Sequence, residues 1–237
     1  MGGSDALVVT FANRCYQYQL LRLIFGSEPN RELISIAASE PTRLSLAFSA
    51  EAGQAQTDVA ASPQAPSLSF LNDLETRLAA DPDGVIDGLR DEYTRLLLGP
   101  EALPAPPWES VYRTKDRVLF APETLEVRRV YVEHGFLPKG YPHEADDHLA
   151  LELDFMYHLA EQAQASYQEG DLAKTRTSLA AQQAFLKDHL LRWIDRFATD
   201  IQQAGAQRFY PQMALTAARL LHEDAATLAW LLEGLEG

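Results

Sequence analysis

Apolar residues along this 237-residue chain recur mostly at the three-to-four-residue spacing of helices that bury one face. The spacing predicts helices over residues 5–25, 30–39, 41–49, 84–98, 146–168 and 172–203, with others between Ser67 and Pro82, between Pro122 and Gly135, and from Pro211 onward. Prolines and glycines stand where these helices are expected to begin or end. Two apolar stripes on 146–168 predict that this helix is central to the core.

The pattern therefore predicts an all-α protein, a single globular bundle of about nine to eleven helices over residues 1–237, with long crossovers between helices. Residues 110–120 carry β-branched and aromatic side chains, so this stretch stays ambiguous between helix and strand. Residues 50–66 have no apolar stripe and are expected to form a mobile surface loop. Residues 1–4 could be a cloning remnant.

Composition narrows the class of function. Hydrophobic residues make up 46 % of the chain, which is typical of a packed protein, and 20 basic against 34 acidic residues give a net charge of −14. This charge opposes nucleic-acid binding, because phosphate contacts need clustered Lys and Arg, and it would attract cationic partners. No apolar run is long enough to span a membrane, the N-terminus lacks the basic start of a signal peptide, and the single Cys15 fits a reducing compartment. We therefore expect a cytoplasmic protein.

Two segments carry the candidate chemistry. Residues 105–112 read Ala-Pro-Pro-Trp-Glu-Ser-Val-Tyr, and residues 144–148 read Glu-Ala-Asp-Asp-His. Proline restricts the backbone, so the first segment is expected to be extended and stiff, with Trp108 and Tyr112 as aromatic anchors. The second segment is an acidic cluster at a predicted helix start. Together they would offer an apolar surface beside a negative one, which suits a partner that is half apolar and half basic.

Simpler interpretations stay open for both segments. Acids at a helix start commonly do no more than cap it, and Trp108 could simply cover the core. His143, Glu144, Asp147 and His148 could hold zinc or manganese in a metal-dependent hydrolase, although no His-x-x-x-His pair shares a helix face. His148 with Asp147 could act in general acid–base catalysis, although the sequence has no serine nucleophile elbow, phosphate-binding loop or CxxC pair.

Four motifs follow one another between about residues 90 and 200. They are Tyr93-Thr-Arg-Leu-Leu, Pro107-Trp-Glu-Ser-Val-Tyr112, Glu144-Ala-Asp-Asp-His148 and Phe185-Leu-Lys-Asp-His189-Leu-Leu-Arg-Trp193. In this order they resemble the Tyr-x-x-Leu-Phe, Pro-Trp-x-Ser-Val-aromatic, Glu-Pro-x-Asp-His and Phe-x-x-x-His-x-x-x-Trp elements of the TorD/DmsD family of redox-enzyme maturation chaperones. Leu97 and Ala145 depart from the family pattern, and the first 85 residues resemble it only as generic helices.

The resemblance implies an all-helical, non-catalytic chaperone with no cofactor or metal of its own. It implies binding of the twin-arginine signal peptide, and of the apoenzyme, of a molybdopterin oxidoreductase of the dimethyl sulfoxide reductase type. The expected peptide-binding residues are Leu96, Trp108, Ser110, Val111, Tyr112, Glu144, Asp147 and His148. The aromatic stretch would take the apolar part of the peptide, and Glu144 and Asp147 would take the arginines, so that Asp147→Asn would weaken binding.

The same family implies either a monomer or a domain-swapped dimer, with residues 121–146 as the hinge. Two other functions stay as alternatives: the metal-dependent hydrolase described above, and a structural subunit of a redox complex.

Overall fold

The computed structural model of this protein describes residues 3–48, 68–99, 103–115, 117, 122–138, 145–205 and 208–235. Within these residues the chain forms eleven α-helices, one π-helical turn and one 3-10 turn, and no strand. The elements are α1 (Gly3–Gly26), α2 (Arg31–Ala38), α3 (Glu40–Ala47), α4 (Ser69–Ala80), α5 (Pro82–Tyr93), η3 (Thr94–Leu98), α6 (Glu109–Arg113), α7 (Pro122–Glu133), α8 (Leu149–Gln168), α9 (Leu172–Asp188), η4 (Leu190–Arg192), α10 (Ile194–Gly205) and α11 (Phe209–Gly234). The prediction of an all-α bundle is confirmed.

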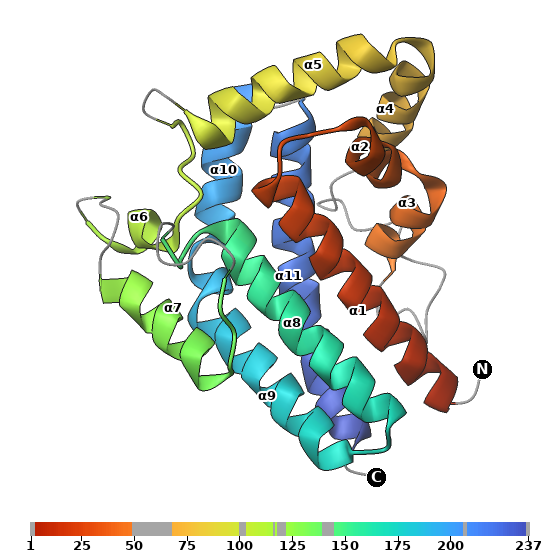
Figure 1. Cartoon of the computed structure of the whole chain (residues 1–237), viewed down its shortest axis with the longest axis vertical. Coiled ribbons are helices and arrows are strands. Elements are labelled where there is room, and N and C mark those ends of the chain that lie inside the picture. The colour runs from red at the N-terminus through yellow and green to blue at the C-terminus, as the bar shows by residue number, and fades with distance from the viewer. Residues whose placement is uncertain are drawn as a thin grey trace.

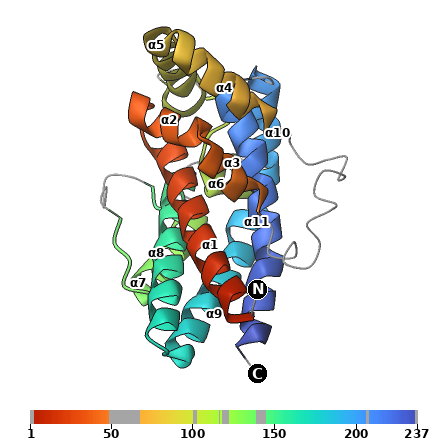
Figure 2. The same cartoon turned by 90° about the vertical axis from the view of Figure 1, so that its right-hand side faces the viewer.

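Four long helices, α1, α8, α9 and α11, make the body of the bundle, and α10 packs against α11 (Figures 1 and 2). α8 lies between α1 and α9 and packs against both. α4 and α5 cross one end of the bundle, and the two chain termini lie towards the other end (Figure 1). α6 and α7 lie beside α8 on the side away from α1. None of the helices in the described part of the chain is long and apolar enough to cross a membrane.

Helix α8 is central because two of its faces are apolar. Leu153 and Met156 on one stripe and Phe155 and Leu159 on the other are all buried, as the sequence predicts. The same buried surface also carries Glu152, which has no exposed area. An acidic side chain in the middle of a core helix is unusual, because a buried charge is costly unless it is paired or neutralised.

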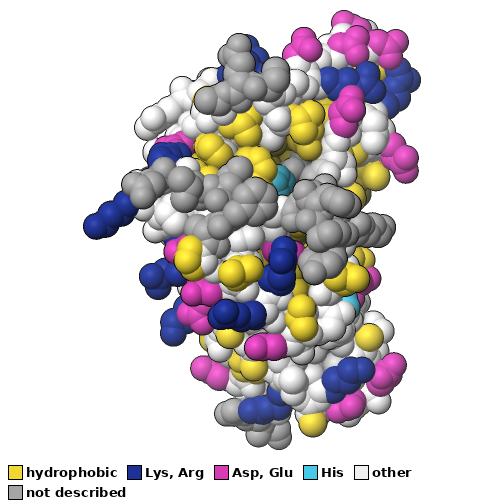
Figure 3. All heavy atoms as spheres, turned by 60° about the vertical axis from the view of Figure 1, so that its left-hand side comes forward, with side chains coloured by type: hydrophobic (Ala, Val, Ile, Leu, Met, Phe, Trp, Pro, Cys, Tyr) yellow, Lys and Arg dark blue, Asp and Glu magenta, His cyan; other side chains and the backbone are white. Residues whose placement is uncertain are grey.

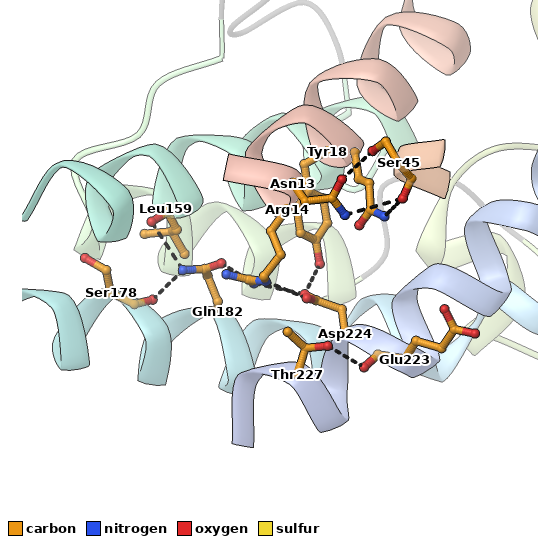
Figure 4. Close-up of polar contacts among 11 residues, drawn as sticks. Asn13, Arg14, Tyr18, Ser45, Leu159, Ser178, Gln182, Glu223, Asp224 and Thr227 are labelled. Atoms are coloured by element: carbon orange, nitrogen blue, oxygen red, sulfur yellow. Dashed lines mark hydrogen bonds and ion pairs between the residues drawn. The ribbon is translucent and has the colours of Figure 1, made fainter. Parts of the chain in front are cut away.

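A separate polar cluster ties α1 to α9 and α11 inside the bundle (Figure 4). We call Arg14, Tyr18, Gln182 and Asp224 the arginine cluster. Arg14 Nε donates to Asp224 Oδ1 at 2.5 Å, and Arg14 Nη2 donates to Gln182 Oε1 at 2.6 Å. The Tyr18 hydroxyl donates to Asp224 Oδ2 at 2.6 Å. Burial opposes the charge on Arg14, but the neighbouring Asp224 carboxylate outweighs it and holds the pKa of Arg14 above its usual range.

The single helix predicted over residues 172–203 is wrong. The chain leaves α9 after Asp188, makes the short turn η4, and resumes as α10 at Ile194. No proline or glycine causes this break. The side chains of His189 and Trp193 instead hydrogen-bond to carboxylates on α6 and α8, so tertiary contacts override the local helical preference.

Other boundaries also shift. The described part of the ambiguous stretch 110–120 is mainly the short helix α6, and the helix predicted to start at 146 begins at Leu149 instead. The preceding residue, His148, is its N-cap. The predicted loop at 50–66 lies outside the described residues, as do parts of the predicted hinge at 121–146.

Candidate peptide-binding site

The two segments singled out in the sequence lie side by side. Residues 107–109 run antiparallel to residues 147–149, and two backbone hydrogen bonds of 2.9 and 3.0 Å hold them together on either side of Trp108 and His148. We call this pairing the Trp–His bridge. The first strand-like segment is extended because consecutive prolines restrict the backbone. Segments almost forty residues apart in sequence thus form one local structure.

Asp147 fastens the bridge to α6. Its Oδ2 accepts the backbone N–H of Ser110 at 2.8 Å, at the free N-terminal end of that helix. Both side chains are fully buried. The capping role expected for the acidic cluster therefore exists, but Asp147 caps α6 and not the helix that follows it in sequence.

His148 performs the capping of α8. Its Nδ1 accepts the backbone N–H of Ala150 at 3.1 Å, which requires that this nitrogen carry no proton. Desolvation lowers the pKa of His148 to about 4, so the imidazole is neutral at physiological pH. The Trp108 ring meets it edge to face, with the ring centroids 5.2 Å apart. The two rings form a neutral, partly exposed aromatic pair.

Exposed apolar side chains are present near this region in the sequence. On the face drawn in Figure 3, hydrophobic side chains gather in one part, with a histidine at their border. The chain that leads into the bridge contributes Leu98, which is 67 % exposed, and the partly exposed Leu103. Exposed apolar side chains and a rigid aromatic pair are both typical of binding surfaces.

Three fully buried carboxyl groups lie beneath the bridge: Glu109, Asp147 and Glu152. We call them the carboxyl cluster. Glu109 Oε1 accepts from Arg113 Nη1 at 2.6 Å, and Glu109 Oε2 lies 3.0 Å from His189 Nδ1. These contacts connect α6 to the end of α9.

Asp147 and Glu152 form no ion pair among the described residues, and Glu152 differs from Asp147 in meeting a side-chain donor. Its Oε2 accepts from Trp193 Nε1 at 3.1 Å. Burial first, and then the charges of Glu109 and Asp147, raise the pKa of Glu152 well above its usual value, and a hydrogen bond with the Glu109 carboxyl group adds to this effect. Burial beside two other acids thus favours the protonated form of the Glu152 carboxyl group.

Asp146 anchors the bridge on its other side. Its Oδ2 accepts from Arg128 Nε at 2.6 Å, and its backbone carbonyl accepts the Tyr131 hydroxyl at 3.0 Å. Both partners belong to α7. The bridge is thus fixed to α6, α7 and α8 together.

The structure leaves few of the predicted site residues at the surface. Trp108 and His148 are partly exposed. The buried ones are Leu96, Ser110, Val111, Tyr112 and Asp147. Glu144 and His143 lie outside the described residues. Direct contact between Asp147 and the arginines of a peptide does not agree with the full burial of its carboxylate inside the bridge.

Sequence reasoning missed the residues that hold the bridge from below. Glu109, Glu152 and Arg113 were not singled out, and His189 and Trp193 were named only as parts of a family motif, without a role at the site. One signal was present: Glu152 is spaced three residues after Leu149 and four before Met156, on the apolar face of its helix. An acid at such a position predicts a buried partner. Among the described residues, no group of three or more His, Cys, Asp or Glu side chains is arranged to hold a metal ion.

Known proteins match the part of the chain that contains this site. The family model for the nitrate reductase delta subunit matches residues 62–199. The TorD chaperone of Vibrio cholerae is 30 % identical over 166 residues, which cover 70 % of this chain and 71 % of that protein. The DmsD Tat proofreading chaperone of Haemophilus influenzae is 28 % identical over 140 residues, which cover 59 % of this chain and 62 % of that protein.

The chain belongs to the TorD/DmsD family of chaperones. The resemblance found in the motifs is therefore confirmed, and the chaperone relatives favour a non-catalytic protein over the hydrolase alternative. This TorD/DmsD-family chain matches just under two thirds of the Haemophilus influenzae protein, at 62 % of its length.

The matched residues of this TorD/DmsD-family chain, 62–199, include both segments of the bridge, the whole carboxyl cluster, His189 and Trp193. A crystal structure from Archaeoglobus fulgidus, assigned as a redox enzyme maturation protein, is 19 % identical, with a TM-score of 0.48, and the alignment covers 88 % of this chain and 93 % of that one.

Proposed function

We propose that this protein is a cytoplasmic chaperone that binds the twin-arginine signal peptide of a molybdopterin oxidoreductase of the dimethyl sulfoxide reductase type, and holds the apoenzyme until its cofactor is inserted. The relatives named as Tat proofreading and TorD chaperones support this class of client. The observation that carries the proposal is the neutral, partly exposed Trp108–His148 pair on a bridge fixed to three helices.

The chemistry of the peptide matches this surface. A twin-arginine signal peptide has a basic front and an apolar middle. The Trp108 indole offers the apolar middle a rigid contact that loses little conformational entropy on binding. The net charge of −14 attracts the basic front and speeds encounter. Glu144 stays a candidate for direct contact with the arginines, while Asp147 acts indirectly by holding the bridge.

The test is calorimetric titration with a synthetic twin-arginine signal peptide. Trp108→Ala is expected to weaken binding by about 30-fold or more, the effect of losing a central aromatic anchor. Trp230→Ala is the matched control, because Trp230 is 38 % exposed but lies on α11, outside the bridge. Affinity should also fall as salt rises. Equal affinity of the wild type and Trp108→Ala would contradict the proposal.

A further inference from the structure

The carboxyl cluster contains more acidic side chains than it has basic partners. Glu109 contacts both Arg113 and His189, at 2.6 and 3.0 Å. Asp147 receives the backbone N–H of Ser110 at 2.8 Å. Glu109 is thus the one acid of the cluster with an arginine partner among the described residues, and Asp147 Oδ1 is buried without a hydrogen-bond partner there.

Glu152 meets only a neutral donor. Trp193 Nε1 donates to its Oε2, while Oε1 is buried and accepts no N–H or O–H from the described residues. An ionised carboxylate would leave this oxygen unsatisfied in the core, at a high cost. A protonated carboxyl group resolves the geometry, because its O–H can donate to the carboxylate of Glu109.

Titratable side chains from several neighbouring elements face Glu152. Glu109 is on α6, Asp147 is on the turn before α8, and Tyr131 is on α7. Among the described residues, the side chains of Arg113 and His189 contact the cluster through Glu109. Burial is the largest cause of the raised pKa of Glu152, and the two acids are the next.

We propose that Glu152 is a positioning residue whose protonated carboxyl group donates a hydrogen bond to Glu109 and so holds the Trp–His bridge in its binding geometry. This role rests on the proposed function, because it assigns Glu152 to the same peptide surface. Loss of the proton to solvent at high pH places a third negative charge beside Glu109 and Asp147. The bridge then loosens, and the peptide binds more weakly.

Glutamine reproduces the protonated form of Glu152. Its amide oxygen can accept from Trp193, and its NH₂ group can donate to Glu109, without any titration. Glu152→Gln is therefore expected to keep the bridge at all pH values, whereas Glu152→Ala removes both contacts. Glu161→Gln is the matched control, since Glu161 is an exposed glutamate on the same helix.

The first measurement does not depend on any peptide. Infrared difference spectra at pH 7 should show the stretching band of a buried protonated carboxyl group in the wild type and in Glu161→Gln, but not in Glu152→Gln. The same band in all three proteins would overturn the proposal. If Glu152→Gln fails to fold, Glu109→Gln provides the test. Without the Glu109 charge, the infrared band should disappear at a lower pH than in the wild type. An unchanged midpoint of this pH titration would overturn the proposal.

The second measurement follows stability with pH. A folded-state pKa above the unfolded value stabilises the protein most at low pH, and this stability is lost as pH rises from about 4.5 through the raised pKa. The wild type should therefore lose stability relative to Glu152→Gln over this range. Parallel curves for the two proteins would count against the proposal.

The third measurement is peptide affinity against pH. The affinity of the wild type for the peptide should fall as pH rises, whereas the affinity of Glu152→Gln should stay constant over the same range. Glu152→Ala should bind the peptide at least about tenfold more weakly than the wild type at every pH. If the wild type binds no twin-arginine peptide, the proposed function fails, while the infrared and stability curves still decide the role of Glu152. If the peptide binds but Glu152→Ala binds it as well as the wild type, the positioning role fails alone.

Discussion

The bundle contains two clusters of buried polar side chains, and the two differ in how the cost of burying charge is reduced. In the arginine cluster, one cation faces one anion at 2.5 Å, and Tyr18 and Gln182 each add a hydrogen bond. In the carboxyl cluster, one arginine and one histidine both contact Glu109, and burial raises the pKa of Glu152. The first cluster is balanced by opposite charge, whereas burial in the second favours the protonated form of one acid.

The two clusters also join different parts of the bundle. The arginine cluster joins the three long helices α1, α9 and α11. The carboxyl cluster lies directly beneath the Trp–His bridge, inside residues 62–199 that match the family model. Ionisable groups with strongly shifted pKa values tend to gather at functional sites, because function can require an arrangement that stability alone would not favour.

The same substitution in both clusters tests this contrast, and its largest effect is expected at Asp224. Asp224→Asn leaves the buried Arg14 guanidinium without its counter-charge, which should reduce the free energy of unfolding by about 3–5 kcal/mol. Urea denaturation at pH 7 measures this loss. Because Arg14 stays charged throughout the accessible pH range, the loss should persist at alkaline pH.

A surface ion pair provides the control for Asp224. Asp154 pairs with Arg22 at 3.0 Å, with side chains that are 27 % and 26 % exposed. Asp154→Asn should cost about 0–1 kcal/mol, since water screens exposed pairs. Equal losses at Asp224 and Asp154 would show that the arginine cluster is not the buried pair described above.

A much smaller effect is expected at Asp147. Asp147→Asn replaces one of the three crowded acids and keeps an oxygen that can cap Ser110, because Asn caps helices as well as Asp does. The free energy of unfolding should change by no more than about 1 kcal/mol. The pKa of Glu152 should fall, since Asp147 is one of the charges that raise it. Titration of the Glu152 infrared band measures this shift.

Peptide binding by Asp147→Asn also separates direct from indirect roles. A direct contact with the arginines would make binding much weaker and less sensitive to salt in this variant. An indirect role, through the bridge, leaves both the affinity and its salt dependence close to those of the wild type.

The periodic pattern of apolar residues was sufficient to predict the helices, but it did not predict the polar contacts between them. The two apolar stripes of α8 predict its central position, because burial of apolar surface dominates packing. The break at His189 was not predictable from local preference, since its cause is a hydrogen bond to a residue eighty positions earlier. Contacts over such distances leave no periodic signal.

The candidate site shows the same division. Motif spacing identified Trp108 and His148, which the structure places face to edge. It also suggested that Asp147 would contact a ligand, because an acidic run near a helix start appears exposed when only the sequence is considered. Pairing of the two segments buries Asp147 instead, and that pairing depends on backbone hydrogen bonds that carry no sequence signature.

His148 gives the smallest effect at neutral pH and the clearest dependence on acid. His148→Asn keeps a side chain that caps α8 and loses mainly the edge contact with Trp108, so it should cost about 0.5 kcal/mol at pH 7. A folded-state pKa near 4, below the ordinary 6.5, gives stability that is fully present above pH 6.5 and is lost as pH falls towards 4. The wild type should therefore lose stability relative to His148→Asn across this window, as measured by thermal unfolding at successive pH values.

His148→Ala separates the loss of the cap from the loss of the titration. This variant also removes the titration but lacks the cap, so its free energy of unfolding should lie about 1 kcal/mol below that of His148→Asn at every pH. A constant difference between the wild type and His148→Asn from pH 7 to pH 4 would mean that His148 does not lie in the desolvated position that makes the surface of the bridge neutral.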